Sequence, residues 1–331
     1  MKNVRLDANT ISRATGCLLG QIAGDSLGSL VEFQCPEEIL DAYPDGVSEL
    51  ADGGTWGTLA GQPTDDSEMA LALARTLVRL GRYDANEVRS AYVAWLDSEP
   101  FDRGGTISRA LRGEMSPSSQ ANGALMRISP VGIFGAGQDL QDVARWATED
   151  AGITHCHSVC LEVNELFAMA LALSIKTGPE QEALYQQILT WAKKRHVSQS
   201  VLDAILAAAE APHEDFTNLQ GWVLIAFRNA LFQLVHAESL EAGVVDTVMR
   251  GGDTDTNAAI CGALLGAVYG REAIPRQWQA CIRNCMPDEK RPNVYQPRPE
   301  IYWPGDTVEL AEKLLRLGWT HESAQPGDLS I

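Results

Sequence analysis

The chain has 331 residues, of which 45% are hydrophobic and 21% are charged, and its formal net charge is −18. This composition is typical of a folded globular protein. The negative charge argues against nucleic acid as a partner, because phosphate binding requires a basic surface. The first residues, MKNVRLD, lack the apolar segment of a secretory signal. No apolar run approaches the roughly 18 residues that span a bilayer. We therefore expect a cytoplasmic protein without a membrane partner.

Helical periodicity prevails along the chain. Apolar residues recur with the helical period over residues 67–80, 158–175, 201–210, 221–235, 256–269 and 307–317. Gly81 and Gly270 directly follow two of these segments, where glycine commonly ends a helix. Alternating strand patterns are scarce, so the sequence predicts an all-α fold. No linker divides the chain, and we place a single domain over residues 10–320, with terminal extensions at 1–9 and 321–331. The proline-rich stretch 286–304 predicts a tail wrapped around this domain.

Small residues recur at every fourth position in two segments. The first series is Gly16, Gly20, Gly24 and Gly28, and the second is Ala258, Gly262, Gly266 and Gly270. This spacing places each series on one helix face, where missing side chains let another backbone approach. A membrane dimerisation motif would have the same spacing, but Gln21 and Asp25 interrupt the first series. We therefore expect two helices packed closely in the core, an arrangement that would bring Glu32 toward the start of the second helix.

Two acidic clusters, Thr64-Asp65-Asp66 and residues 251–256 (GGDTDT), each precede a long helical pattern. Crowded carboxylates repel one another unless protons or cations neutralise them. Oxygen ligands of this kind suit Mg²⁺ or Mn²⁺. The glycines before the second cluster let a ligand approach the chain. We interpret the clusters as two halves of one divalent-metal site.

Two simpler interpretations compete with this one. Thr and Asp are common helix N-caps, but a cap needs one side chain and each cluster supplies two carboxylates and a hydroxyl. Zinc would favour Cys and His. However, Cys156 and Cys160, like Cys281 and Cys285, lack the usual two-residue spacing, and four-residue spacing on helices is more typical of core cysteines. We therefore reject zinc.

An ordered series of motifs resembles the ADP-ribosylglycohydrolase family, in particular its bacterial members. It comprises residues 16–20 (GCLLG), 24–28 (GDSLG), Glu32, 61–69 (GQPTDDSEM), 122–127 (NGALMR), 153–155 (ITH), 251–257 (GGDTDTN) and Arg291-Pro292 with Tyr295. The likeness runs in order from about residue 12 to residue 318, which is far more specific than any single motif. It implies an all-α enzyme with two Mg²⁺ or Mn²⁺ ions that hydrolyses the bond joining ADP-ribose to a protein side chain.

The resemblance also implies roles for particular residues. The metal ligands would be Thr64, Asp65, Asp66, Asp253, Asp255 and Thr256, and the catalytic carboxylates would be Glu32, Asp65 and Asp255. The substrate-binding residues would be Asp102, Gly104, Asn122, Gly123, Ala124, Met126 and His155. The loop 101–106 (FDRGGT) departs from the family's common Asp-Ile-Gly-Asn-Thr, and Trp56 occupies a region that usually carries Gly-Pro-Phe. These loops shape the pocket entrance. The resemblance therefore indicates least clearly which amino-acid side chain of the substrate protein carries the ADP-ribose.

Arginine is the preferred linkage, because the overall likeness is to arginine-directed bacterial members. Serine-linked, oligomeric and O-acetylated ADP-ribose remain alternatives within the same chemistry. The expected partners are an ADP-ribosylated protein and, as a further candidate, a cognate ADP-ribosyltransferase. A different class is an immunity protein that binds and neutralises such a transferase. A dinuclear phosphohydrolase would also suit the acidic clusters, and it would release phosphate or AMP rather than intact ADP-ribose.

Overall fold

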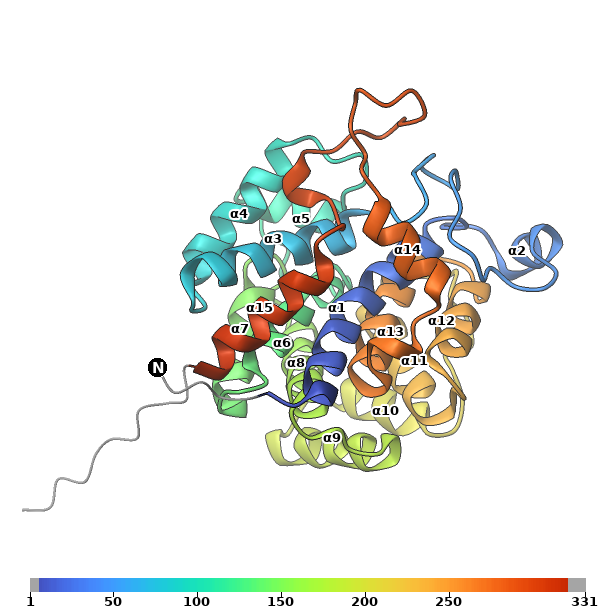
Figure 1. Cartoon of the computed structure of the whole chain (residues 1–331). Helices are drawn as coiled ribbons and strands as arrows, with labels where there is room; N and C mark the ends of the chain where they lie inside the picture. The colour runs from blue at the N-terminus through green and yellow to red at the C-terminus, as the bar shows by residue number, and fades with distance from the viewer. Residues whose placement is uncertain (1–5, 321–331) are drawn as a thin grey trace, which may run out of the picture.

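The computed structural model describes residues 6–320, and this part of the chain contains fifteen α-helices and no strand (Figure 1). The predicted all-α fold is confirmed. The helices are α1 Ala8–Gly28, α2 Pro36–Ala42, α3 Asp65–Leu80, α4 Ala85–Asp97, α5 Gly105–Leu111, α6 Ser129–Gly135, α7 Leu140–Gly152, α8 Ser158–Thr177, α9 Gln181–Arg195, α10 Gln199–Ala208, α11 Val223–His236, α12 Leu240–Met249, α13 Thr254–Tyr269, α14 Arg276–Asn284 and α15 Thr307–Thr320.

Each helical segment expected from periodicity corresponds to a helix. Gly81 and Gly270 follow α3 and α13 with positive φ angles of 67° and 80°, as expected for glycines that end helices. Both helices begin two residues earlier than predicted, at Asp65 and Thr254. The acidic clusters therefore contribute to the first helical turns, and do not simply precede the helices.

Helices α1 and α13 lie side by side at the centre of the molecule (Figure 1). A Cβ atom added to Gly16 would lie 2.5 Å from the carbonyl oxygen of Gly266, and one added to Gly24 would lie 2.0 Å from that of Ala258. No side chain fits at either position, so the two backbones can approach only because glycine is present. The predicted close packing of the two small-residue series is confirmed.

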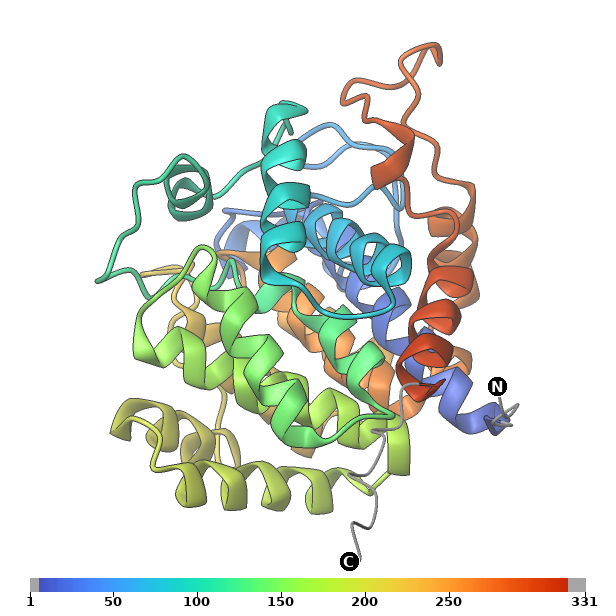
Figure 2. The same cartoon turned by 90° about the vertical axis from the view of Figure 1, so that its left-hand side faces the viewer.

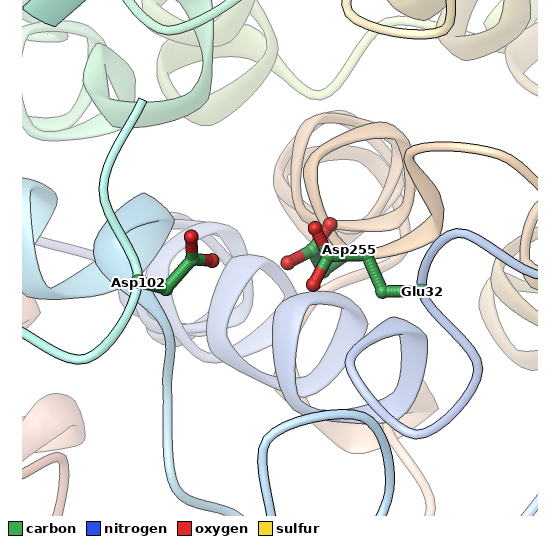
Figure 3. A group of neighbouring side chains, drawn as sticks. All are labelled: Glu32, Asp102 and Asp255. Carbon is green, nitrogen blue, oxygen red and sulfur yellow. The ribbon is translucent and has the colours of Figure 1, made fainter. Parts of the chain in front are cut away.

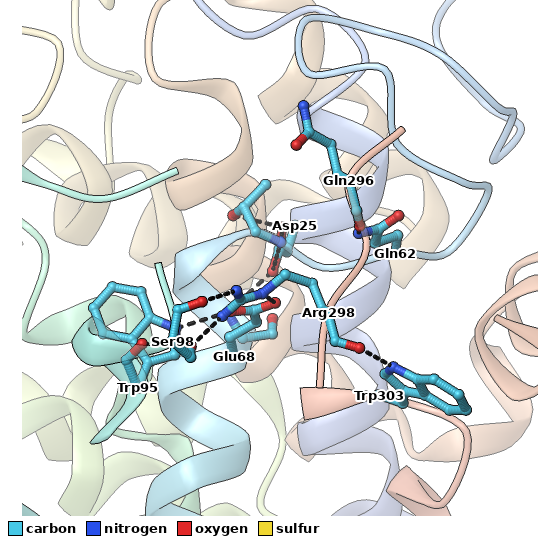
Figure 4. Close-up of polar contacts among 10 residues, drawn as sticks. Asp25, Gln62, Glu68, Trp95, Ser98, Gln296, Arg298 and Trp303 are labelled. Carbon is cyan, nitrogen blue, oxygen red and sulfur yellow. Dashed lines mark hydrogen bonds and ion pairs between the residues drawn. The ribbon is translucent and has the colours of Figure 1, made fainter. Parts of the chain in front are cut away.

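The proline-rich stretch after α14 returns over α3, as the predicted wrapped tail requires, and α15 then packs against α1 and α6 (Figure 2). Gln62 donates from Nε2 to the carbonyl oxygen of Gln296 at 2.7 Å, and Arg298 forms a buried ion pair with Glu68 (Figure 4). The tail is therefore joined to the helix that carries the first acidic cluster.

One helix in the described part of the chain, α8, is long and apolar enough to cross a membrane. Its apolar window is 72% buried inside the structure, as is usual for a central helix of a globular fold. All seven cysteines lie within the described residues and are free thiols.

Candidate active site

A cavity of about 290 Å³ opens where the N-termini of α3 and α13 meet the chain that follows α1. Most of the predicted site residues line it: Glu32, Asp65, Asp66, Asp102, Gly104, Asn122, Gly123, Met126, His155, Asp253, Asp255 and Thr256. Thr64 and Ala124 are the two predicted residues outside the wall, and both are fully buried behind it. Segments separated by more than two hundred residues therefore converge on one space, which also includes Arg103 and Gln220.

The first acidic cluster is held by α3 and by a carboxylate from α1. Thr64 is the N-cap of α3, but its side chain accepts no capping hydrogen bond. Its hydroxyl lies 2.9 Å from Asp25 Oδ1 and 3.2 Å from Asp66 Oδ2, and the Thr64 and Ser67 amides donate to Asp25. The capping interpretation therefore does not account for Thr64, whose polar atoms serve the cluster.

The second cluster begins at a tight backbone turn. Gly251 and Gly252 adopt φ angles of 73° and 75°, and a Cβ atom on Gly252 would lie 2.0 Å from the carbonyl oxygen of Phe216. Asp253 is the N-cap of α13 without a side-chain capping bond, and its Oδ2 instead accepts from Asn122 Nδ2 at 2.7 Å. The glycines thus aim the Asp253 carboxylate across the cavity.

A hydrogen bond joins the two clusters directly. Thr256 Oγ1, on α13, donates to Asp66 Oδ2, on α3, at 3.3 Å. The other oxygen of Asp66, Oδ1, is buried and has no hydrogen-bond partner. A buried carboxylate oxygen without a donor is costly, so this position suits a cation or a water molecule.

Glu32, Asp102 and Asp255 form a third grouping. One carboxylate oxygen from each lies within 4.8 Å of the others, an arrangement that could hold a metal ion (Figure 3). Glu32 reaches the start of α13 because its neighbour Phe33 donates its amide to the Gly252 carbonyl oxygen at 2.8 Å. The proximity expected from the two small-residue series is therefore present.

Burial and mutual repulsion raise the pKa of these carboxyl groups. Burial, reinforced by the charge of Asp253, raises the pKa of Glu32 to about 8. Burial also raises the pKa of Asp65 to about 7 and that of Asp102 to about 10, and it raises that of Asp255 well above its ordinary value. Among the described residues, no Lys, Arg or His forms an ion pair with any of them. Such crowding favours either protonation of these carboxyl groups or a bound cation.

The part of the cavity wall formed by Asn122, Gly123 and His155 is polar and uncharged. Arg127, fully buried in an ion pair with Asp150, donates from Nη1 to the Gly123 carbonyl oxygen at 3.2 Å and so supports the loop that carries Asn122. His155 Nδ1 lies 2.8 Å from Thr154 Oγ1, and its Nε2 is buried without a partner. Burial lowers the pKa of His155 to about 3, so its ring is neutral at physiological pH. This wall can accept an uncharged polar group such as a sugar hydroxyl.

Sequence reasoning did not identify the contacts that three residues make within the site. Asp25 orients Thr64, Arg298 binds Glu68 one turn after Asp65, and Trp56 donates to Glu32. The sequence signals for Asp25 were its place in the 24–28 motif (GDSLG) and its charge, which interrupts the small-residue series. Nothing in the sequence paired Trp56 or Arg298 with its partner.

Fold and cavity together define an all-helical protein with a buried site rich in carboxylates and able to hold a metal ion. A sequence model of the ADP-ribosylglycohydrolase family matches residues 6–323. ADP-ribosyl-[dinitrogen reductase] glycohydrolase of Rhodospirillum rubrum is 30% identical over 286 residues, covering 80% of this chain and 88% of the relative. The chain therefore belongs to the ADP-ribosylglycohydrolase family, whose members hydrolyse ADP-ribose from modified targets.

Other relatives fall within the same family. ADP-ribosylarginine hydrolase Tri1 of Pseudomonas putida is 26% identical, covering 81% of this chain and 73% of the relative. Human ADP-ribosylhydrolase ARH3 is 28% identical, and the match covers 82% of this chain and 89% of the relative. A solved structure described as an ADP-ribosylglycohydrolase-related protein complex superposes with a TM-score of 0.77 at 25% identity, covering 94% of this chain and 99% of that one. The relative from Pseudomonas putida is named for arginine and ARH3 is not. These similarities therefore do not identify the linkage that this protein cleaves.

Proposed function

We propose that this protein hydrolyses the N-glycosidic bond between ADP-ribose and arginine side chains of modified proteins, and so reverses an ADP-ribosyltransferase in the cytoplasm. The observation that carries the proposal is the convergence of Glu32, Asp102, both acidic clusters and the Asn122 loop on one buried cavity. A phosphohydrolase would also use acidic ligands, but it would have no need of the ordered family motifs that form this cavity.

The carboxylates suit divalent metal. Asp66 Oδ1 is buried without a donor, and oxygens of Glu32, Asp102 and Asp255 lie within 4.8 Å of one another. Mg²⁺ or Mn²⁺ prefers such oxygen ligands. The proposed ligands are Thr64, Asp65, Asp66, Asp253, Asp255 and Thr256, with two ions in total. Bound metal would neutralise the crowded carboxylates and act as a Lewis acid toward the substrate.

The chain's own groups then perform the proton transfers. Hydrolysis breaks the bond between the ribose C1″ and the arginine nitrogen, adds the water oxygen to C1″, and returns a proton to the leaving nitrogen. Positive charge builds on the ribose ring as the bond breaks, and the carboxylates of Asp65 and Asp255, which bound metal would keep ionised, would stabilise it. Glu32, whose pKa is about 8, is suited to exchange a proton near neutral pH. Asn122, Gly123 and His155 would bind the ADP-ribose, and Asp102 would contact the ribose or the leaving group.

Arginine is the proposed linkage for two reasons. The relative from Pseudomonas putida is named as an ADP-ribosylarginine hydrolase, and an acidic cavity favours a cationic guanidinium as the leaving group. The similarity to ARH3 makes serine-linked ADP-ribose the principal competing substrate, and the assay below includes it.

The test is incubation of the purified protein with arginine-ADP-ribosylated protein, with Mg²⁺, Mn²⁺ or EDTA, followed by quantification of free ADP-ribose by mass spectrometry. Serine-linked and O-acetylated ADP-ribose are assayed in parallel. Metal-dependent release of intact ADP-ribose, fastest from arginine, is expected. Release from serine alone would overturn the arginine assignment, and release of AMP or phosphate would overturn the reaction.

Glu32→Gln provides the matched variant, since it keeps the shape of the side chain and removes its proton exchange. General acid–base groups typically contribute about 10²–10⁴-fold to rate, and we expect a loss of kcat in this range. Glu38→Gln, at an exposed position on α2, is the control and should retain full activity.

A further inference from the structure

Trp56 contacts Glu32, one of the carboxylates of the cavity, directly. Its indole Nε1 donates to Glu32 Oε2 at 2.6 Å. A hydrogen bond to a carboxylate is shorter and stronger than one between neutral groups. The Glu32 oxygen that accepts it is therefore held in place, which determines the direction in which the rest of the carboxylate faces Asp102 and Asp255 (Figure 3).

The loop that carries Trp56 is itself tightly held. Gly53 and Thr58 pair their backbones at 2.8 and 2.9 Å, and the Thr55 hydroxyl donates to the Glu32 carbonyl oxygen at 3.0 Å. A Cβ atom on Gly54 would lie 2.6 Å from the Cα atom of Leu30, so the loop packs directly on the chain that leads from α1 to Glu32. The indole is thus placed by backbone contacts and not by its own rotamer preference alone.

The ring of Trp56 also joins the two loops that border the cavity mouth. Its centroid lies 6.4 Å from that of Phe33 and 6.0 Å from that of Phe101. Phe33 follows Glu32 in sequence, and Phe101 precedes Asp102. One indole therefore packs between the neighbours of two carboxylates that come from distant parts of the chain. Gln296 of the tail donates from Nε2 to the Trp56 carbonyl oxygen at 2.9 Å and so also holds the backbone of this loop.

We propose that Trp56 is a positioning residue: its N–H sets the orientation of the Glu32 carboxylate, and its ring sets the separation of the Glu32 and Asp102 loops. This inference rests on the proposed function, because it assigns Trp56 a purpose through Glu32. Trp56 contacts no reacting atom, and its effect should therefore fall on kcat while KM changes little.

The first measurement is the indole N–H region of a ¹H–¹⁵N NMR spectrum, in which the eight tryptophans give separate resonances. Trp56→Phe assigns one resonance by removing it. Glu32→Gln should then shift that resonance, because the group that accepts the indole hydrogen bond changes from a carboxyl to an amide. Trp303 is the control, since its Nε1 donates to the Arg298 carbonyl oxygen at 2.7 Å and does not contact Glu32. A Trp56 resonance that does not respond to Glu32→Gln would overturn the proposal. If Trp56→Phe fails to fold, nuclear Overhauser contacts to the rings of Phe33 and Phe101 assign the resonance instead.

The second measurement is kinetic. Trp56→Phe keeps the packed ring and removes the donor, and we expect kcat to fall roughly tenfold, the effect of losing one hydrogen bond to a charged group. Trp56→Ala, which also removes the contacts to Phe33 and Phe101, should lower kcat further, whereas Trp303→Phe should leave it unchanged. Wild-type kcat in folded Trp56→Phe would contradict the proposal. If the wild-type protein released no ADP-ribose from any substrate, the proposed function would fail, while the NMR result would still decide whether Trp56 positions Glu32.

Discussion

Arg298 and Glu68 form a bidentate ion pair across 230 residues of sequence, with Nε to Oε1 and Nη2 to Oε2 distances of 2.8 Å (Figure 4). Both side chains are at most 3% exposed. Arg298 also donates to the carbonyl oxygen of Ser98 at 2.9 Å, and Trp95 donates to Glu68 at 2.8 Å. One guanidinium thus links the tail, the helix of the first acidic cluster and the loop that leads to Asp102.

Replacing Arg298 should therefore destabilise the protein strongly. Arg298→Met leaves Glu68 buried and unpaired, and breaking a buried ion pair in this way typically costs about 3–5 kcal/mol. The measurement is the free energy of unfolding in urea. Arg316→Met removes an exposed partner of Glu312, and it should cost less than about 1 kcal/mol. Equal losses in the two variants would show that burial of the Arg298 pair has no energetic consequence.

The close contact of α1 and α13 predicts that alanine destabilises the protein when it replaces a glycine at this contact, and not when it replaces a helical glycine elsewhere. A Cβ atom at position 24 would lie 2.0 Å from the Ala258 carbonyl oxygen, which is backbone and cannot move aside. Overpacking of this kind typically costs about 1–3 kcal/mol or more, so Gly24→Ala should lower the melting temperature by several degrees.

Gly152→Ala is the matched control. Gly152 also lies in a helix, and a Cβ atom there meets nothing within 4 Å. Because alanine has the higher helix propensity by about 1 kcal/mol, this variant should be as stable as the wild-type protein or more stable. Comparable destabilisation by both substitutions would contradict the packing argument.

The raised pKa values predict that metal stabilises the protein more at high pH. Folding favours the protonated forms of Glu32 and Asp65, whose pKa values are about 8 and about 7. Their contribution to stability without metal is fully present below about pH 4, and it is lost as pH rises through 7 and 8. Bound cations would remove this penalty and would compete with protons at low pH.

The measurement is the melting temperature at pH 5 and pH 8 with EDTA and with Mn²⁺. The metal-induced increase should be larger at pH 8. In Asp255→Asn, which lacks a proposed ligand, it should shrink at both pH values. An increase of the same size at pH 5 and pH 8 in the wild-type protein would rule out proton competition at the cluster.

Asp25 should influence metal affinity without entering the cavity. Its carboxylate accepts from the amide and hydroxyl of Thr64 and from the amide of Ser67. Asp25→Asn replaces one carboxylate oxygen with an NH₂ group, which cannot accept the hydrogen bonds that Thr64 and Ser67 donate. The substitution should therefore disturb the first turn of α3. Residues that orient ligands typically contribute about 10–100-fold to affinity, and we expect a loss in this range for Mn²⁺ by titration calorimetry. Asp203→Asn on α10 should bind like the wild-type protein.

Much of the candidate site could be predicted from the sequence because its residues lie in short, dense motifs. Residues 64–66 and 251–256 each place several oxygen atoms that could bind metal within about one helical turn. In the structure, the carboxylates of both clusters line one cavity. The four-residue glycine spacing predicted the contact of α1 and α13, since one helix face is determined by local geometry. Thr64 lies in the first cluster and Ala124 in the motif 122–127, but both are buried behind the cavity wall. Proximity in sequence does not determine which side chains face the cavity.

The sequence by itself determined the helical class, the two central helices and the identity of the acidic clusters, because these depend on residue types within a few turns of one another. Only the tertiary structure decided that Asp102 joins Glu32 and Asp255, that Trp56 holds Glu32, and that Arg298 neutralises Glu68. Each of these contacts joins residues at least 24 positions apart. Their formation depends on how loops and tail pack around the core, and a single guanidinium or indole in the sequence gives no indication of its partner.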